Sequence, residues 1–221
     1  MKLFTIPNII TLGNLLCGVL GLISIQNGEI KQASILILIA LILDFLDGFI
    51  ARLTNLYSEI GKQLDSLADM VSFGVLPSLI LFQLLIDAGQ LRYIALLPAL
   101  ASALRLAKFN IDERQSDSFR GLPTPANAMV IAVFPFILEN GITFINTDYV
   151  LTAYAVIISY IMISDIPMLA LKFKNFTWKN NQIRIIFLIL SISSLLLFRF
   201  AGVPIILFIY IGLSLFSKPK A

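Results

Sequence analysis

Long runs of apolar residues, separated by short polar segments, extend along the whole 221-residue chain. The runs are continuous and do not alternate between apolar and polar positions, so the pattern predicts helices and not strands. We therefore expect an all-α integral membrane protein, a polytopic bundle of about eight transmembrane helices. The expected spans are residues 8–26, 33–53, 63–88, 91–109, 126–144, 149–171, 182–200 and 202–217.

The composition supports a membrane protein, since 58% of the residues are hydrophobic, 13% are charged and the mean hydropathy is +0.93. Soluble domains are nearer a quarter charged. No polar linker, low-complexity tract or convincing repeat interrupts the chain. We expect a single membrane domain over residues 1–221, with the last two helices (182–217) peripheral. The N-terminal stretch loosely resembles a lipoprotein signal, but Leu16 is bulky where a cleavage site needs a small residue, so we interpret it as a retained first helix.

The distribution of basic residues predicts the orientation in the membrane. If the N-terminus faces the cytoplasm, every lysine and arginine except Lys31, Arg92 and Arg199 falls on the cytoplasmic side. This bias predicts that both termini are cytoplasmic in a multi-pass protein of the cell membrane. The same placement explains the net charge of +3, so no nucleic-acid partner is needed and the lipid bilayer is the expected surrounding.

Four aspartates interrupt the apolar pattern in the stretch DFLDGFIARLTNLYSEIGKQLDSLAD, residues 44–69. Asp44 and Asp47 are three residues apart on the second span and share a helix face. Asp65 and Asp69 are four residues apart at the start of the third span and also share a face. An antiparallel arrangement of these spans lets the two carboxylate pairs face each other at the cytoplasmic end.

Carboxylates this close together repel each other, and buried charge in a membrane is costly, so cations must compensate. Arg52 and Lys62 can neutralise part of the charge, and divalent ions would do so better. The chain has no histidine, and Cys17 is its single cysteine, so hard oxygen ligands for magnesium, manganese or calcium are expected, and not a zinc or copper site. Two pairs suit two ions, a common arrangement for displacement at phosphorus.

Two small residues, Gly48 and Ala51, share the face of Asp44 and Asp47 and leave a strip without bulky side chains beside the acids. A phosphate or a flat base can lie against such a strip. Small residues also serve ordinary helix packing. Paired aspartates in membrane helices can likewise form a cation or proton pathway, so a membrane cation transporter is an alternative from a different class.

The spacing D-x2-D-G-x2-A-R-x8-G-x3-D-x3-D resembles the signature of the CDP-alcohol phosphatidyltransferases without departure. The stretches TIPNIITLGNLLCG, SLADMVSFGVLPS, RLAKFN and GLPTPANA are similar to the phosphatidylserine synthase branch of that family, so the likeness extends from the start of the chain to about Ala128. The resemblance implies transfer of a phosphatidyl group from CDP-diacylglycerol to L-serine, with release of CMP. It also implies a helical bundle that opens to the cytoplasm and forms a homodimer.

Site roles follow from the resemblance, position by position. Asp44, Asp47, Asp65 and Asp69 would be ligands of a divalent metal, Mg²⁺ or Mn²⁺, with two ions expected, and Asp69 would also be the catalytic base. The CDP-lipid would contact a second set, which consists of Gly48, Ala51, Arg52 and Ser58. If Asp69 is only a ligand, a water relays the proton of the attacking hydroxyl.

The sequence indicates the acceptor site less specifically than it indicates the metal site. The segment after the fourth span offers four residues to the carboxylate and polar groups of serine: Arg105, Lys108, Asn110 and Arg120. Basic residues at a cytoplasmic helix end also anchor to lipid phosphates. The same cations would serve glycerol 3-phosphate or inositol phosphate, so the preference for serine rests on the resemblance and not on the charges.

Overall fold

The computed structural model describes residues 3–111, 120–140, 148–169 and 178–216 of the chain. Helices dominate these ranges, which contain no strand beyond one isolated bridge between Arg120 and Pro167. The α-helices are α1 (Ile6–Gln26), α2 (Ile30–Thr54), α3 (Glu59–Asp69), α4 (Leu76–Leu84), α5 (Leu97–Ile111), α6 (Thr124–Glu139), α7 (Asp148–Ile163), α8 (Trp178–Phe198) and α9 (Gly202–Phe216). The π-helix η1 (Met70–Val75) and the 3₁₀ helices η2 (Gly89–Leu96) and η5 (Arg199–Ala201) join some of them.

The described helices confirm a multi-pass, all-α membrane protein. α1, α2, the continuous α3–η1–α4 unit, the η2–α5 unit and the stretch 181–215 are each long and apolar enough to cross a bilayer. α6 and α7 are apolar but have only 16 residues each. Every expected span overlaps one of these helices, while residues 141–144, 170–171 and 217 of the expected spans lie outside the described residues.

The largest departure from the expected boundaries is at the end of the sixth span. The span predicted to reach residue 171 is helical only to Ile163, where α7 ends. Ile166 precedes Pro167, and a residue before proline is pushed out of the helical conformation. The freed backbone instead pairs with the segment before α6, since the Gly121 amide donates to the Ile166 carbonyl at 2.9 Å.

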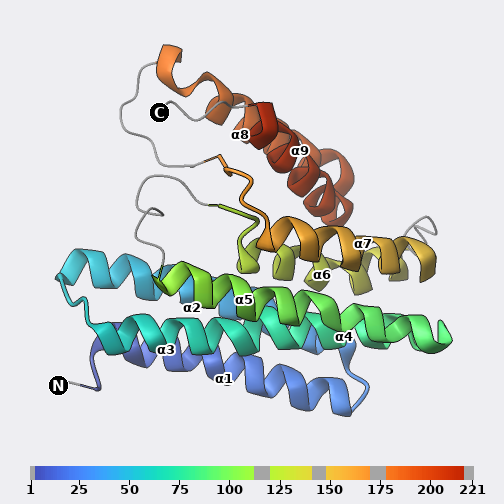
Figure 1. The fold of residues 1–221 in the computed structure, drawn as a ribbon, viewed down its shortest axis with the longest axis horizontal. Coiled ribbons are helices and arrows are strands. Elements are labelled where there is room, and N and C mark those ends of the chain that lie inside the picture. Colours follow the sequence, from blue (N-terminus) through green and yellow to red (C-terminus); the bar gives the residue numbers. More distant parts are fainter. Residues whose placement is uncertain (1–2, 112–119, 141–147, 170–177, 217–221) are drawn as a thin grey trace.

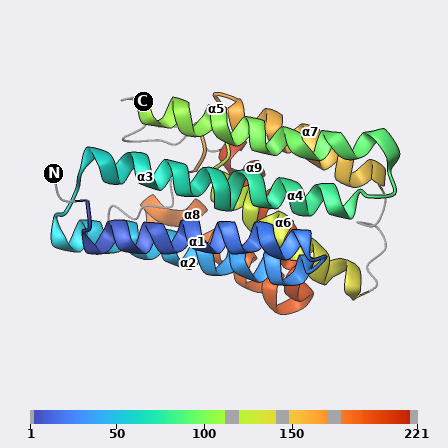
Figure 2. The same cartoon turned by 90° about the horizontal axis from the view of Figure 1, so that it is seen from below.

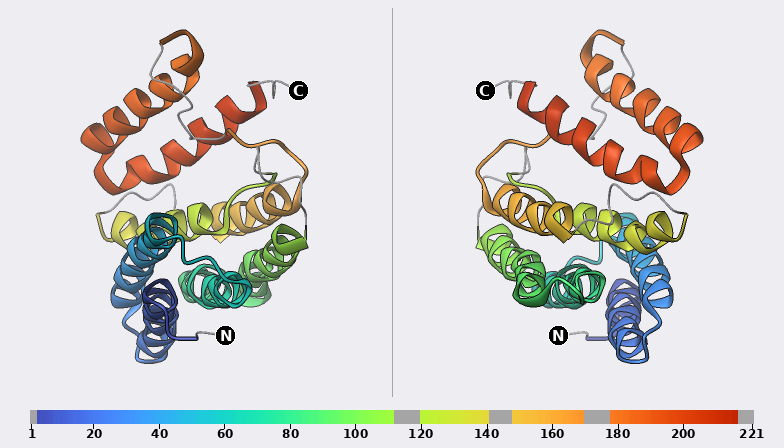
Figure 3. Two further views of the ribbon diagram at one scale, coloured as in Figure 1. Left: turned by 90° about the vertical axis from the view of Figure 1, so that its left-hand side faces the viewer. Right: turned by 90° about the vertical axis from the view of Figure 1, so that its right-hand side faces the viewer.

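The helices lie mostly along one axis. Figures 1 and 2 show α1 packed beside α2, with the α3–η1–α4 unit next to them and α5 beyond it. Figure 3 views the molecule along this axis and shows the α8–α9 hairpin crossing obliquely above α6 and α7. The α3–η1–α4 unit is the most buried of the candidate spans, and its residues Phe73, Leu76 and Ile80 are fully buried in the core.

The α8–α9 hairpin joins this bundle through α9. The Tyr210 hydroxyl donates to the Leu169 carbonyl at 3.1 Å, and the Leu169 amide donates to Ser214 Oγ at 3.0 Å. Leu207 and Tyr210 are buried and belong to the hydrophobic core. In Figure 1 the hairpin lies on the other side of α6 and α7 from α1 and α3.

α1 shows the polarity expected in a bilayer. Its buried face consists of small and polar residues: Pro7, Asn8, Thr11, Asn14, Gly18, Gly21 and Ser24. Its large residues Ile9, Leu16 and Ile23 are exposed. Helices in lipid pack through small side chains and keep polar groups inside, so this exposed apolar face suits contact with lipid tails.

The turn between α2 and α3 brings the two aspartate pairs to the same end of the bundle. Asn55 ends α2 in the left-handed conformation, with φ 53°, which asparagine tolerates better than most residues. Ser58 then caps α3, since its Oγ accepts from the Gly61 amide at 3.0 Å. The chain therefore reverses within a few residues, and α3 runs antiparallel to α2 and packs against α1.

Candidate metal and active site

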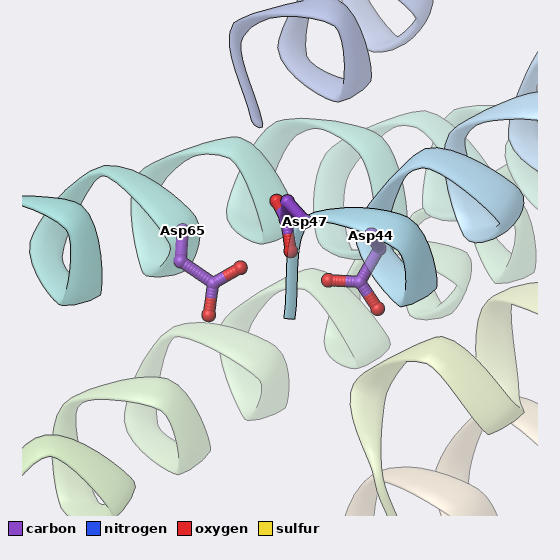
Figure 4. Close-up of side chains that lie close together, drawn as sticks. All are labelled: Asp44, Asp47 and Asp65. Carbon is purple, nitrogen blue, oxygen red and sulfur yellow. The ribbon is translucent and has the colours of Figure 1, made fainter. Parts of the chain in front are cut away.

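Three carboxylates converge between α2 and α3. Asp44, Asp47 and Asp65 each offer one oxygen, and these oxygens all lie within 4.8 Å of one another. Figure 4 shows the three side chains directed into the same space, Asp44 and Asp47 from α2 and Asp65 from α3. The structure therefore brings acids of the second and third expected spans close together, as the sequence predicts.

Asp69 extends the cluster inward. It is the last residue of α3, its side chain is buried, and it lies close enough to Asp44 and Asp65 for their charges to interact. The helix changes to the π form immediately after it, in η1. Short π segments within α-helices are frequent at functional sites, because they redirect the side chains on either side.

The cluster fits a hard divalent cation. Its donors are carboxylate oxygens, the ligands that magnesium and manganese prefer. In the described part of the chain two ion pairs form, Lys31–Glu139 and Lys108–Asp165, and neither involves these four acids. Several negative charges in contact and partly buried need a cation nearby. Asp44, Asp47 and Asp65 would hold it, with Asp69 beside them.

Neither Arg52 nor Lys62, which were expected to neutralise part of the charge, forms an ion pair with the four acids in the described ranges. Arg52 Nε donates to the Gly48 carbonyl of its own helix at 2.9 Å, and Lys62 Nζ donates to the Asn110 carbonyl at 3.0 Å. Both cations are thus bonded to backbone oxygens, which carry a negative partial charge and no net charge. Their positive charge remains available at the edge of the site.

A cavity of about 220 Å³ opens next to the acids. Asp47 and Asp65 line it together with three residues expected to contact a nucleotide diphosphate, Gly48, Ala51 and Ser58. The strip beside Gly48 is open, because a Cβ placed there would meet only Arg52 Nη2, at 3.9 Å. Two of the four acids and the expected binding strip therefore share one cavity.

α1 supplies two site contacts that the sequence analysis missed. Thr11 Oγ1 donates to Asp47 Oδ2 at 2.6 Å, and Asn14 Nδ2 donates to Asp69 Oδ1 at 3.4 Å. Both polar side chains are buried. A signal existed in the sequence, since Asn8, Thr11 and Asn14 recur every three residues in an otherwise apolar span.

Arg105 is the residue of the expected acceptor set whose charge interacts with one of the four acids. Its side chain is buried, its charge interacts with that of Asp69, and its Nη1 donates to Thr124 Oγ1 at 3.3 Å. Arg105 Nε is buried and has no hydrogen-bond partner among the described groups. An unused donor of this kind can bind a ligand carboxylate.

The other three residues of that set have different surroundings. Lys108 Nζ pairs with Asp165 Oδ1 at 2.6 Å on the surface. Asn110 binds α3 through Ser66 Oγ at 3.0 Å. Arg120 forms the isolated bridge to Pro167 and is half-buried. The structure thus brings Arg105 to the aspartates, while these three residues link neighbouring elements at the same end of the bundle.

The chain is similar to a family of known transferases. The sequence profile described as CDP-alcohol phosphatidyltransferase matches residues 4–163. A Helicobacter pylori protein named CDP-diacylglycerol–serine O-phosphatidyltransferase is 34% identical over 203 residues, which cover 89% of this chain and 83% of the relative. A Bacillus subtilis protein of the same name is 36% identical, over 73% of this chain and 88% of the relative. An archaetidylserine synthase of Methanothermobacter thermautotrophicus is 32% identical, over 73% of this chain and 68% of the relative.

Proposed function

Since the chain belongs to the CDP-alcohol phosphatidyltransferase family, we propose that it transfers the phosphatidyl group of CDP-diacylglycerol to the hydroxyl of L-serine, giving phosphatidylserine and CMP. The observation that carries this proposal is the cluster of Asp44, Asp47 and Asp65 beside a cavity lined by Gly48 and Ala51. Relatives that are named for the serine reaction match most of the chain, and this similarity favours serine over other small alcohols as the proposed acceptor.

Asp44, Asp47, Asp65 and Asp69 hold divalent cations in this proposal, two ions of Mg²⁺ or Mn²⁺. Bound cations would supply positive charge that offsets the charge on the phosphoryl oxygens and on the departing CMP. The open strip at Gly48 and Ala51, with Ser58 at the helix cap, receives the nucleotide diphosphate. Arg52 lies one helical turn from Gly48 and adds charge at the edge of that strip.

Asp69 is the proposed catalytic base. It accepts the proton of the serine hydroxyl, and the serine oxygen forms a bond to the lipid-side phosphorus while the bond to the CMP oxygen breaks. The base is buried beside Asp44 and Asp65, so proton acceptance and metal binding take place in the same small volume. The transfer is direct, and no enzyme-bound phosphatidyl intermediate forms.

Arg105 binds the carboxylate of serine in this proposal. It is buried near Asp69 and has an unused Nε–H donor, so a bound carboxylate would place the serine hydroxyl on the side of the base. Lys108, Asn110 and Arg120 complete the acceptor side of the site at the same end of the bundle.

Replacing Arg105 by lysine tests this role. We expect the KM for serine to rise by about 10- to 100-fold, because a charge-assisted hydrogen bond contributes about 1.5–3 kcal/mol and lysine lacks the planar fork of arginine. The KM for CDP-diacylglycerol should change little. The measurement is steady-state CMP release at varied serine, with Arg92→Lys at the other end of the bundle as control. An unchanged KM for serine would remove Arg105 from the acceptor site.

The proposed topology has eight spans, cytoplasmic termini and a cytoplasmic active site in the cell membrane. Its support is the location of Arg52, Lys62, Arg105 and Lys108 at the aspartate end of the bundle, with Lys31 and Arg92 toward the other end. The active form is a homodimer, as the family resemblance implies.

Isolated membranes containing the protein provide the test of function. Given CDP-diacylglycerol and Mg²⁺, radiolabelled serine should enter the lipid fraction while an equal amount of CMP appears. Labelling from glycerol 3-phosphate or inositol phosphate in place of serine would assign a different acceptor within the same enzyme class. Flux of metal ions across vesicles without any lipid product would overturn the enzyme in favour of a cation transporter.

A further inference from the structure

One face of α1 contacts carboxylates from both aspartate pairs. Thr11 reaches Asp47 on α2, with 2.6 Å between the oxygens, and Asn14 reaches Asp69 on α3, with 3.4 Å between nitrogen and oxygen. Residues three apart on a helix lie on the same face. The spacing of Thr11 and Asn14 along α1 is therefore matched to the spacing of two acids that belong to different helices.

The direction of the Thr11 hydrogen bond follows from charge. Thr11 Oγ1 lies 3.0 Å from the Pro7 carbonyl as well as 2.6 Å from Asp47 Oδ2, and the hydroxyl has one proton to donate. A carboxylate oxygen is the stronger acceptor, and its contact is the shorter one. Thr11 is buried, with 3% of its surface exposed, so bulk water has little access to this hydroxyl.

α1 is itself held in register next to the site. Ser72 Oγ, in η1, donates to the backbone carbonyl of Asn14 at 3.0 Å. A Cβ on Gly18 would lie only 2.5 Å from Ser72 Oγ, so the two helices approach as closely as glycine permits. Asn14 is thus bound through its backbone as well as its side chain, and it cannot move away from Asp69 without breaking this contact.

We propose that Thr11 and Asn14 are positioning residues that orient Asp47 and Asp69 for binding a divalent cation. The inference rests on the proposed metal site. A carboxylate with one oxygen held by a fixed donor loses freedom of rotation, so its orientation is set before the cation arrives. Removing hydrogen-bond partners of metal ligands typically weakens metal binding by about 10- to 100-fold.

Two substitutions at Thr11 separate the hydroxyl from the bulk of the side chain. Thr11→Val keeps the shape and removes the donor, and we expect it to weaken Mn²⁺ binding by about tenfold or more. Thr11→Ser keeps the donor and should restore most of the affinity. Binding is measured on the purified full-length protein in detergent, by electron paramagnetic resonance of free Mn²⁺. Ser24→Ala is the control, since Ser24 Oγ donates to the Leu20 carbonyl within α1 and touches no aspartate.

Asn14→Leu is a second, independent variant with the same expected loss, and it decides the question if Thr11→Val does not accumulate in the membrane. Wild-type affinity in the donor-deleting variants would overturn the inference, as would an equal loss in Thr11→Ser and Thr11→Val. These outcomes leave the proposed transfer reaction intact. Absence of Mn²⁺ binding by the wild-type protein would instead overturn the metal site itself, and the positioning role with it.

Discussion

Replacing Asp69 by asparagine is expected to lower the rate of CMP release by about 100- to 10,000-fold, the usual contribution of a positioned general base. The amide is nearly isosteric with the carboxyl group but cannot accept the serine proton. It can still accept the hydrogen bond from Asn14 Nδ2, so the variant should fold and insert into the membrane. The measurement is CMP release by purified protein at saturating serine and CDP-diacylglycerol.

The control for this substitution is Asp87→Asn, an exposed acid beyond the end of α4 that does not belong to the aspartate cluster. Mn²⁺ affinity, measured on the same preparations, separates the two roles assigned to Asp69. Lost turnover with retained Mn²⁺ binding supports the base, whereas loss of both indicates that Asp69 acts mainly as a ligand and that a water relays the proton. Near-normal CMP release by Asp69→Asn would rule out the base.

Much of the fold follows from local sequence features. Continuous apolar runs predict helices because the bilayer offers no partners to the backbone, so each predicted span overlaps a helix. Hydropathy predicts that the sixth span continues to residue 171, because Ile166 and Met168 are apolar, but α7 ends at Ile163. Pro167 lacks the backbone N–H that a helix interior requires and therefore does not continue the helix. Hydropathy alone does not register this local constraint.

The convergence of the aspartates was also predictable. The i, i+3 spacing of Asp44 and Asp47 places both on one face of α2, and a short turn brings Asp65 of α3 opposite them. Such reasoning needs only helix geometry and one reversal of the chain.

The contacts of α1 with these acids were not predictable in the same way. Thr11 and Asp47 are 36 positions apart, and Asn14 and Asp69 are 55 apart, so their contacts depend on how whole helices pack. The surroundings of the basic residues near the end of the fourth span also depend on helix packing and could not be predicted from the sequence. Lys108 and Arg105 have the same charge and neighbouring positions, yet Lys108 pairs with Asp165 on the surface and Arg105 is buried near Asp69.

Removing divalent metal is expected to abolish phosphatidyl transfer, and adding Mg²⁺ or Mn²⁺ in excess of the chelator should restore it. Metal ions in displacement at phosphorus contribute several kcal/mol of charge stabilisation, and every 1.4 kcal/mol changes a rate about tenfold, so we expect a loss of roughly 1,000-fold or more. The assay follows radiolabelled serine into lipid, first with EDTA and then after titration with each metal.

Asp44→Asn provides the matched variant, because Asp44 lies close to Asp47, Asp65 and Asp69. Its low activity should not be rescued by the metal concentration that restores the wild-type protein. Added Mn²⁺ should also raise the thermal unfolding temperature of the wild-type protein more than that of Asp44→Asn, since a ligand that binds only the folded state stabilises it by about 2.7 kcal/mol at 100 times its dissociation constant. Full activity in EDTA, or identical responses of the two proteins to Mn²⁺, would mean that the clustered carboxylates serve some purpose other than holding a cation.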